Sequence, residues 1–496
     1  MSYHTAPQET ENVSTRFVWK HFMPLAWLLI YLASPLRAQE PNGSLRLAAP
    51  AAATAISARS VGQLDPTSPQ AAPAGQSLTL EQLLQIARMN NPTLGEAQAG
   101  IRKAAGRTLQ AGLWPNPAIG YAGDEIRGGS LRGGEQGVFI QQNVVLGGKL
   151  DLDRKIFAEE GKQTEAEAEE QRLRVESGVR IAFYQSLAAQ EMVQTRSKLS
   201  GLAKDAVETT QQLFNIGQAD EPDLLQAQVE ADEADLAVLV AEQDQRRAWR
   251  VLSAVVGKPA MALAELEGSL DDLPSVDPDR MLETILRDSP AVKIAQLNST
   301  RAEAALARAR REVVPDLFLR AGLSNDSEPL GDATSRPVGL IGFAEVGVDL
   351  RLFNRNQGNV QAARADVERA NLELQRVSLT LRQMAAPVLE NYASSRAVAQ
   401  MYKSRTLPNA QRAYELYLQR YREGAAAYPQ ALIAERTFFD LQASYISALE
   451  NVWINALTLQ GLLLTDGLDV PAAPGEVDNA VREINVPMVE APGARP

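Results

Sequence analysis

Two stretches of the chain alternate apolar side chains with polar or small ones, which is typical of a β-strand with one apolar and one polar face. From Ala344 to Leu352 every even position is Ala, Val or Leu, and the odd positions are Glu, Gly, Asp and Arg. The segment from Gly137 to Leu146 shows the same alternation. With the partner strands that it requires, this pattern predicts four strands, at about 118–123, 137–146, 317–324 and 343–353.

Long stretches rich in Ala, Leu and charged residues predict helices after each pair of strands. The first stretch, 149–221, contains no proline, and a single helix of about 65 residues would extend about 100 Å. The second runs over about 357–423, where Pro387 and Pro408 are expected to kink or open the helix. No globular core is that long.

Two shorter helices are expected to return along the first long one, at 222–256 and 280–314. Their combined length about matches that of the long helix, so we expect them to stack end to end beside it. The segment between them is interrupted by Pro and Gly. It is therefore expected to form a belt at mid-height.

The chain is internally duplicated. Asn91-Pro92 corresponds to Ser289-Pro290, an offset of 290 minus 92, or 198. Pro115 corresponds to Pro315, an offset of 200, and Gly217 to Gly424, an offset of 207. The sequence therefore predicts two copies of one unit, 78–270 and 271–470, each a large helical hairpin that carries a small β-hairpin.

The two ends of the chain are expected to lie outside these copies. Basic residues precede an uncharged stretch at 22–36, which is short for a membrane-spanning helix and suits a secretory signal peptide. We expect cleavage after Ala38, so that 1–38 is removed. The Ala/Pro-rich segment 39–77 is expected to be a disordered linker, and 471–496 a disordered tail.

Composition excludes several classes of function. With 49 Lys and Arg against 61 Asp and Glu, the formal net charge is -12, so nucleic acid is not expected as a partner. A mean hydropathy of -0.20 excludes a polytopic helical membrane protein. There is no cysteine, and the two histidines, His4 and His21, lie in the expected signal peptide. The mature chain then lacks the usual soft metal ligands and the commonest general base.

Catalytic motifs are also missing. The segment 143–150 (NVVLGGKL) lacks the first Gly and the final Ser or Thr of a phosphate-binding loop, and no Ser/His/Asp triad can form without histidine. The carboxylate pairs Asp271-Asp272 and Glu159-Glu160 are assigned no chemistry. The sequence therefore predicts no enzyme, no cofactor and no metal site.

The strands have the length and the two-faced pattern of membrane strands, although two half-buried hairpins on a soluble protein would alternate in the same way. Four strands cannot close a barrel, and open sheet edges are not tolerated in lipid. Three copies would supply about twelve strands and enclose a pore, which predicts a homotrimer. A different class, a periplasmic coiled-coil scaffold or adaptor, would need one helical hairpin and a soluble β-domain.

The sequence resembles the TolC-like outer membrane efflux factors from Leu78 to about Asp469. The resemblance rests on four motifs: Leu84, Ala87, Asn91 and Pro92; Trp114-Pro115-Asn116-Pro117; Leu146-Gly147-Gly148-Lys149; and Gly217 with Asp223-Leu224-Leu225. The run at 352–359 (LFNRNQGN) is similar to the branch that serves cobalt, zinc, cadmium, copper or silver efflux.

The resemblance implies a mainly α protein with a transmembrane β portion, in the outer membrane of a Gram-negative bacterium. It implies a homotrimeric twelve-stranded β-barrel that continues into a periplasmic α-helical tunnel. A periplasmic adaptor would join this passive duct to a proton-driven inner-membrane pump. Drug efflux and type I protein secretion remain alternatives to heavy-metal efflux. The strand-to-helix junctions are expected at Gly147, Gly148 and Lys149, and at Asn354, Arg355 and Asn356.

The tips of the helical hairpins are expected to close the duct and to meet the adaptor. In tip one, Asp220, Glu221 and Asp223 either cap a helix that begins near Pro222 or form an acidic ring around the pore axis. In tip two, the family often places gate aspartates six and nine residues after the glycine, where this chain has Gln430 and Ile433. The residues expected at the adaptor-docking tips are Gly217, Leu224, Leu225, Gly424 and Leu432.

Overall fold

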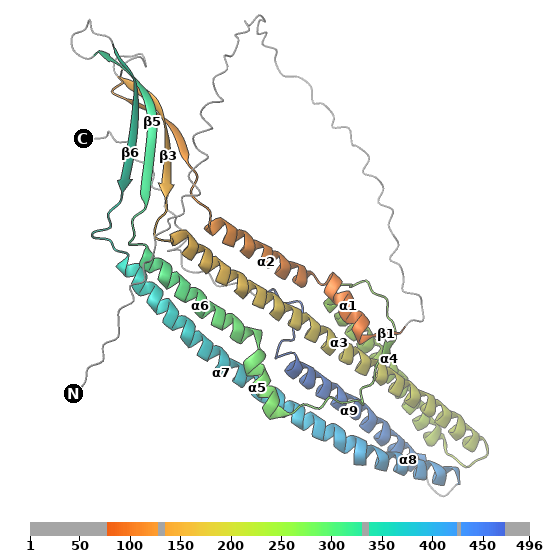
Figure 1. Ribbon diagram of the computed structural model, residues 1–496. Helices are drawn as coiled ribbons and strands as arrows, with labels where there is room; N and C mark the ends of the chain where they lie inside the picture. Colours follow the sequence, from red (N-terminus) through yellow and green to blue (C-terminus); the bar gives the residue numbers. More distant parts are fainter. Residues whose placement is uncertain (1–76, 127–133, 330–336, 424–427, 472–496) are drawn as a thin grey trace, which may run out of the picture. The chain divides into compact units, whose positions relative to one another are not determined.

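The computed structural model describes residues 77–126, 134–329, 337–423 and 428–471 (Figure 1). All of them belong to one unit, Gln70–Pro496. The expected signal peptide, most of the expected linker and tail, and Gly424 lie outside the described residues.

The same order of elements occurs twice. The first copy contains β1 (Leu78–Thr79), α1 (Leu80–Asn90), α2 (Pro92–Ala111), β2 (Ala118–Asp124), β3 (Glu135–Val144), α3 (Lys149–Asn215) and α4 (Glu221–Val255). The second contains β4 (Leu266–Glu267), α5 (Pro278–Asp288), α6 (Pro290–Arg311), β5 (Leu317–Pro329), β6 (Pro337–Val348), α7 (Gln357–Met401), a π-helix (Tyr402–Thr406), α8 (Leu407–Arg422) and α9 (Tyr428–Gln460). Each copy is a helix pair, a β-hairpin, a long helix and a returning helix.

Helix α3 confirms the long helix predicted from the proline-free stretch, with 67 residues. Its N-terminal half packs against α2 and α6, and its C-terminal half packs against α4 and α9 (Figure 1). Ion pairs mark both halves: Arg308 of α6 binds Asp153, and Lys204 binds Asp235 of α4. Helices far apart in sequence therefore line one long axis.

The sequence predicted one helix over the return segment 280–314. The structure has two helices there. Helix α5 ends at Asp288, Ser289 is its C-cap and also the N-cap of α6, and Pro290 begins α6. Proline has no backbone N–H to continue the hydrogen-bond ladder, and it disfavours helical geometry in the residue before it. The same break occurs in the first copy at Asn91 and Pro92.

The two prolines of the second long helix act differently. Pro387 lies inside α7, which continues through it. Pro408 lies in the first turn of α8, directly after the five-residue π-helix. Because Pro408 cannot donate to the carbonyl four residues earlier, the ladder opens before it.

The four longer strands form one antiparallel sheet in the order β2-β3-β5-β6. Directly opposed residues include Ile140, paired with Ile119 and Ala321, and Leu317, paired with Val144 and Val348. Strands β2 and β6 are the two edges of this sheet. A second, two-stranded sheet joins β1 to β4 in parallel, and the sequence pattern did not predict it.

The last strand was predicted at about 343–353, and that position is wrong. Strand β6 begins at Pro337 and ends at Val348, so Leu350 and Leu352 lie beyond it. Val348 pairs with Leu317, the first residue of β5, and the residues after Val348 have no partner strand in the described part of the chain. Alternation continues past the point where pairing stops, so it could not mark the end of the strand.

The hydrophobic core gathers at mid-height, where the belt 256–277 crosses the helices. Its members include Phe183 and Leu187 of α3. The belt is fixed by polar anchors: the indole N–H groups of Trp249 and Trp453 donate to the carbonyls of Met261 and Leu270. The predicted belt is thus part of the core.

Within the described residues, no helix is both long enough and apolar enough to cross a bilayer.

Candidate functional site

The sheet has one continuous apolar face. Apart from Gln136, Gln142 and Asn325, the residues on this face are apolar or small, and many are exposed: Ile119, Tyr121, Val138, Ile140, Leu319, Leu323, Leu340, Val346 and Val348. The most exposed of these, Ile119, shows 79% of its surface. A soluble protein rarely leaves so large an apolar patch uncovered, so this face needs an apolar environment.

The opposite face is polar, with aromatic side chains laid over glycines. The guanidinium of Arg320 lies 4.2 Å from the ring centroid of Phe139 and 5.6 Å from that of Phe343. A Cβ added at Gly120 would lie 2.5 Å from the Phe139 ring, so glycine is required for this packing. Cross-strand pairing places Arg320 directly opposite Glu345. This face can therefore line an aqueous space.

Both junctions between a strand and a long helix use a left-handed residue. Gly148, the N-cap of α3, has φ of 69°, and Asn356, the N-cap of α7, has φ of 62°. Gly147 also has a positive φ, 74°. Only glycine and, less readily, asparagine adopt this conformation at low cost. The predicted junction residues thus turn the chain from sheet to helix in both copies.

Lys149 ties the first junction to the second copy. Only 1% of its surface is exposed, and its ammonium lies 2.9 Å from Asp316 Oδ1. The same oxygen accepts the backbone N–H of Leu146 at 2.9 Å. Sequence analysis did not single out Asp316 as a site residue, although it follows Pro315, which aligns with Pro115.

The second junction is held mainly by its own residues. Asn354 Oδ1 accepts the N–H of Asn356, and Arg355 Nε donates to the carbonyl of Leu352. Asn356 Nδ2 donates to the carbonyl of Ala309 near the end of α6, at 2.9 Å. The second long helix is thus anchored to α6.

Beneath the junctions, buried ion pairs join α3 to α6. Arg308 Nε lies 2.7 Å from Asp153 Oδ1, and Arg308 also binds Glu312, which binds Arg351. Burial raises the pKa of Asp153, and the Arg308 charge opposes this rise. This network links the helices to the segment that follows β6.

Glu160 and Glu167 lie one and two heptads after Asp153 on α3. On the antiparallel helix α6, the positions one and two heptads before Arg308 are Arg301 and Ile294. Glu160 binds Arg107 of α2 at 2.6 Å. Glu167 is only 3% exposed, and its Oε2 has no hydrogen-bond partner among the described residues. Burial, and next the Glu170 charge, raise the pKa of Glu167 to about 7.

Tip one is built as the sequence indicated. Gly217, with φ of 71°, ends α3, and the N–H of Gln218 bonds the carbonyl of Leu213 at 2.8 Å. This is a Schellman arrangement. Asp220 is the N-cap of α4 through its backbone, since its side chain makes no capping hydrogen bond. Helix α4 begins at Glu221.

The predicted gate residues are not gathered into one cluster within the chain. Asp220 and Glu221 are exposed, and Asp223 is half-buried. In tip two, Gln430 and Ile433 are exposed on α9.

The predicted docking residues differ in exposure. Leu224 is buried and Leu432 half-buried, whereas Leu225 is 54% exposed. Leu225 begins an exposed apolar stripe along α4 that continues with Val229, Leu236, Leu239 and Val240.

Above the tips, the two helical hairpins meet through a charged contact that sequence analysis missed. Arg436 of α9 lies 3.8 Å from Glu230 and 3.7 Å from Glu233, both of α4. Glu435 is buried beside them, and burial, followed by the Glu230 charge, raises its pKa to about 7. Spacing along one helix could not reveal this contact, because Arg436 lies 206 positions after Glu230 and 203 after Glu233.

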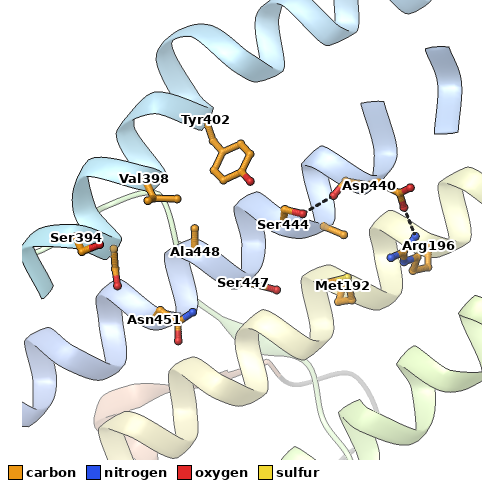
Figure 2. Close-up of a pocket in the computed structure, with 12 residues that line it drawn as sticks. Met192, Arg196, Ser394, Val398, Tyr402, Asp440, Ser444, Ser447, Ala448 and Asn451 are labelled. Carbon is orange, nitrogen blue, oxygen red and sulfur yellow. Dashed lines mark hydrogen bonds and ion pairs between the residues drawn. The ribbon is translucent and has the colours of Figure 1, made fainter. Parts of the chain in front are cut away.

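A groove of about 700 Å³ lies between α3, α7 and α9, and Figure 2 shows the residues that line it. Hydroxyl and small side chains line most of it, among them Ser394 of α7 and Ser444 and Ser447 of α9. An ion pair between Arg196 and Asp440 closes one end, with an N–O distance of 3.4 Å.

In the part of the chain that the structure describes, no group of three or more His, Cys, Asp or Glu side chains is arranged to hold a metal ion.

Comparison with known proteins gives a consistent result. The family model described as outer membrane efflux protein matches residues 83–258 and 281–463, more than half of the chain. The cobalt-zinc-cadmium resistance protein CzcC of Cupriavidus metallidurans is 29% identical over 394 residues, which cover 79% of this chain and 91% of that protein. The pyoverdine export outer membrane protein OpmQ of Pseudomonas aeruginosa is 24% identical over 392 residues, covering 73% of this chain and 80% of that protein.

Among solved structures, that of CusC, studied for its transmembrane channel formation, has a TM-score of 0.64 at 18% identity. The match covers 78% of this chain and 92% of that one. At this identity the likeness shows the fold.

Proposed function

This chain belongs to the outer membrane efflux protein family, and from that premise we propose that it is the outer-membrane channel of a tripartite efflux system. Three identical chains form a twelve-stranded barrel that continues into a helical tunnel across the periplasm. A periplasmic adaptor connects the tunnel to a proton-driven inner-membrane pump, and the channel itself is passive.

The two-faced sheet with two unpaired edges carries this proposal. Its apolar face suits lipid, and its polar face suits a water-filled lumen. Backbone groups at the edges of β2 and β6 would have no partner in the bilayer. If β6 of one chain pairs with β2 of the next chain, three chains close the sheet and no edge remains.

Heavy-metal cations are the proposed substrates. The support is the relative CzcC, whose name records cobalt, zinc and cadmium resistance. OpmQ, whose name records pyoverdine export, supports siderophore or drug export as a second candidate, at lower identity and coverage. The channel shows no metal site within its described residues, so selectivity is assigned to the pump.

The proposed gate combines two elements of the tips. Asp220, Glu221 and Asp223 repeat three times around the axis and attract cations to the periplasmic mouth. Arg436, which bridges α9 to Glu230 of α4, holds the hairpins together in the closed state. Opening then requires this contact to break.

Adaptor docking is proposed at the tips, where Leu225 begins the exposed stripe of α4. The hydroxyl-lined groove of Figure 2, between α3, α7 and α9, is proposed as a second contact surface. Both surfaces are proposed to bind a helical hairpin of the adaptor.

Two experiments test the function. Purified protein should be trimeric in mild detergent and should conduct ions in planar bilayers; a monomer without conductance would refute the channel. Deletion of the gene should lower tolerance to Co²⁺, Zn²⁺ or Cd²⁺ and leave siderophore export intact. The reverse pattern would favour the second candidate.

A further inference from the structure

A group of apolar side chains remains exposed at the end of the sheet that joins the helices. Phe353, between β6 and α7, has 93% of its surface exposed, and Leu350 and Leu352 beside it are also exposed. Trp114, four residues before β2, is exposed too. These four apolar residues lie outside the paired strands, just before β2 and just after β6.

The backbone next to Trp114 is held against the apolar face by a hydrogen bond. Gln142 Nε2 donates to the carbonyl of Pro115 at 2.8 Å. Gln142 pairs with Leu319, so its side chain lies on the apolar face. The chain just after Trp114 therefore runs along that face.

A second group, of basic side chains, lies at the helix ends nearest the sheet: Arg154, Lys155, Arg310, Arg311 and Arg355. All five are exposed, and none forms an ion pair with a described residue. Their neighbours Arg308 and Arg351 do form ion pairs. The nearby exposed acids in the sequence are Asp151 and Asp349, so the unpaired charge is mainly positive.

Helix dipoles explain only part of this charge. Arg310 and Arg311 lie in the last turn of α6, where a positive charge is favourable. Arg154 and Lys155 lie in the second turn of α3, and Arg355 lies just before α7. The dipole favours positive charge only at a helix C-terminus, so it accounts for none of these three residues.

We propose that these nine residues, here named the collar, bind anionic phospholipid headgroups of the leaflet that faces the periplasm. The inference rests on the proposed function, because it requires the sheet to span the bilayer. Leucine and aromatic side chains then lie at the boundary between acyl chains and headgroups, and the basic side chains reach the lipid phosphates. Apolar residues continuous with the lipid-facing side and adjacent unpaired cations are complementary to this one surface.

The test uses the full-length trimer in neutral detergent. Dioleoyl phosphatidylglycerol or dioleoyl phosphatidylcholine is added in steps, and bound lipid is counted by native mass spectrometry while the melting temperature is followed. The parent should bind the anionic lipid more tightly and gain melting temperature from it. The collar variant changes all five basic residues to glutamine: Arg154→Gln, Lys155→Gln, Arg310→Gln, Arg311→Gln and Arg355→Gln. It should bind phosphatidylglycerol at least about tenfold more weakly and phosphatidylcholine unchanged.

A matched control removes five exposed basic charges away from the sheet: Lys198→Gln, Lys258→Gln, Arg382→Gln, Arg405→Gln and Arg412→Gln. It should keep the lipid preference of the parent. If the five-residue collar variant does not fold, as judged by its helical circular dichroism, the single Arg355→Gln and Phe353→Ser variants are measured instead. Each should reduce phosphatidylglycerol binding by about threefold or more.

Three results overturn the inference. The collar variant could bind both lipids like the parent. It could bind lipid normally but change the ion selectivity of the channel, in which case the charges face the lumen. It could dissociate into monomers without added lipid, in which case the collar is a contact between the chains of the trimer. In each case a parent that still forms conducting trimers leaves the proposed function intact, so the two failures are distinguishable.

Discussion

Replacing Glu167 with glutamine should stabilise the protein at neutral and alkaline pH and leave its stability unchanged below about pH 4.5. The folded chain holds the Glu167 proton more tightly than the unfolded chain, because the pKa rises from 4.5 to about 7. Stability from this group is therefore complete below pH 4.5, falls as the pH rises toward 7, and is lost above 7. Glutamine keeps the size and the hydrogen-bonding capacity without the charge.

The magnitude follows from the pKa. A rise of about 2.5 pKa units corresponds to at most about 3.4 kcal/mol, at about 1.4 kcal/mol per unit. Solvent that reaches the adjoining cavity of about 890 Å³ screens part of it, so we expect about 1–2 kcal/mol. For a unit of this size, that is a rise of about 1–3 °C in melting temperature.

The assay is the melting temperature of parent and variant in the same detergent at pH 4 and pH 8.5. The two should melt together at pH 4, and the variant should melt higher at pH 8.5. Comparison of the two proteins isolates Glu167 from Glu435, whose pKa is also raised to about 7. Glu160→Gln is the control: it removes a paired carboxylate and leaves Arg107 without its partner, so it should lower stability at both pH values. A Glu167→Gln variant that melts lower than the parent at pH 8.5 would refute the reasoning.

Three further predictions concern the sheet, the junction and the gate. Ile140→Arg, on the apolar face near the middle of β3, should lower the stability of the barrel by about 2–4 kcal/mol and reduce the amount of trimer recovered from membranes. Gln141→Arg, on the polar face, should be tolerated, and equal effects of the two changes would contradict the assignment of faces. Gly148→Val should lower the melting temperature through about 1–2 kcal/mol of backbone strain, and Gly148→Asn should cost less, because nothing lies within 4 Å of an added Cβ and only the φ of 69° matters. Arg436→Gln should raise single-channel conductance, while Arg246→Gln, which breaks an ion pair within one helix, should leave it unchanged; no difference between the two would exclude Arg436 from the gate.

Local patterns in the sequence were enough to predict α3 and the two-faced strands. A stretch without proline permits one long helix, and alternation with a period of two reports the faces of a strand wherever it pairs. The position of the first junction, at Gly147 and Gly148, was expected from the family resemblance, but its left-handed conformation was not predicted.

The contacts between distant segments could not be predicted in the same way. Strand β5 pairs with β3 of the other copy, and Asp316 binds Lys149 across 167 positions. Neither contact produces a residue pattern within one segment, so neither could be predicted from the spacing of residues along the chain. The end of β6 was missed for the same reason, since Leu317 of the partner strand decides where pairing stops.

Disulfide cross-linking in isolated outer membranes tests the central claim most directly. The chain has no cysteine, so introduced pairs report without background. Ile119→Cys on β2 is combined in turn with Ala344→Cys and Val346→Cys on β6. Within one chain two strands separate these edges, a distance of about 14 Å, far beyond the reach of a disulfide. If three copies close the barrel, one pair should give covalent trimers on oxidation and each single cysteine none; monomers alone from both pairs, or a protein absent from the outer membrane, would contradict the account.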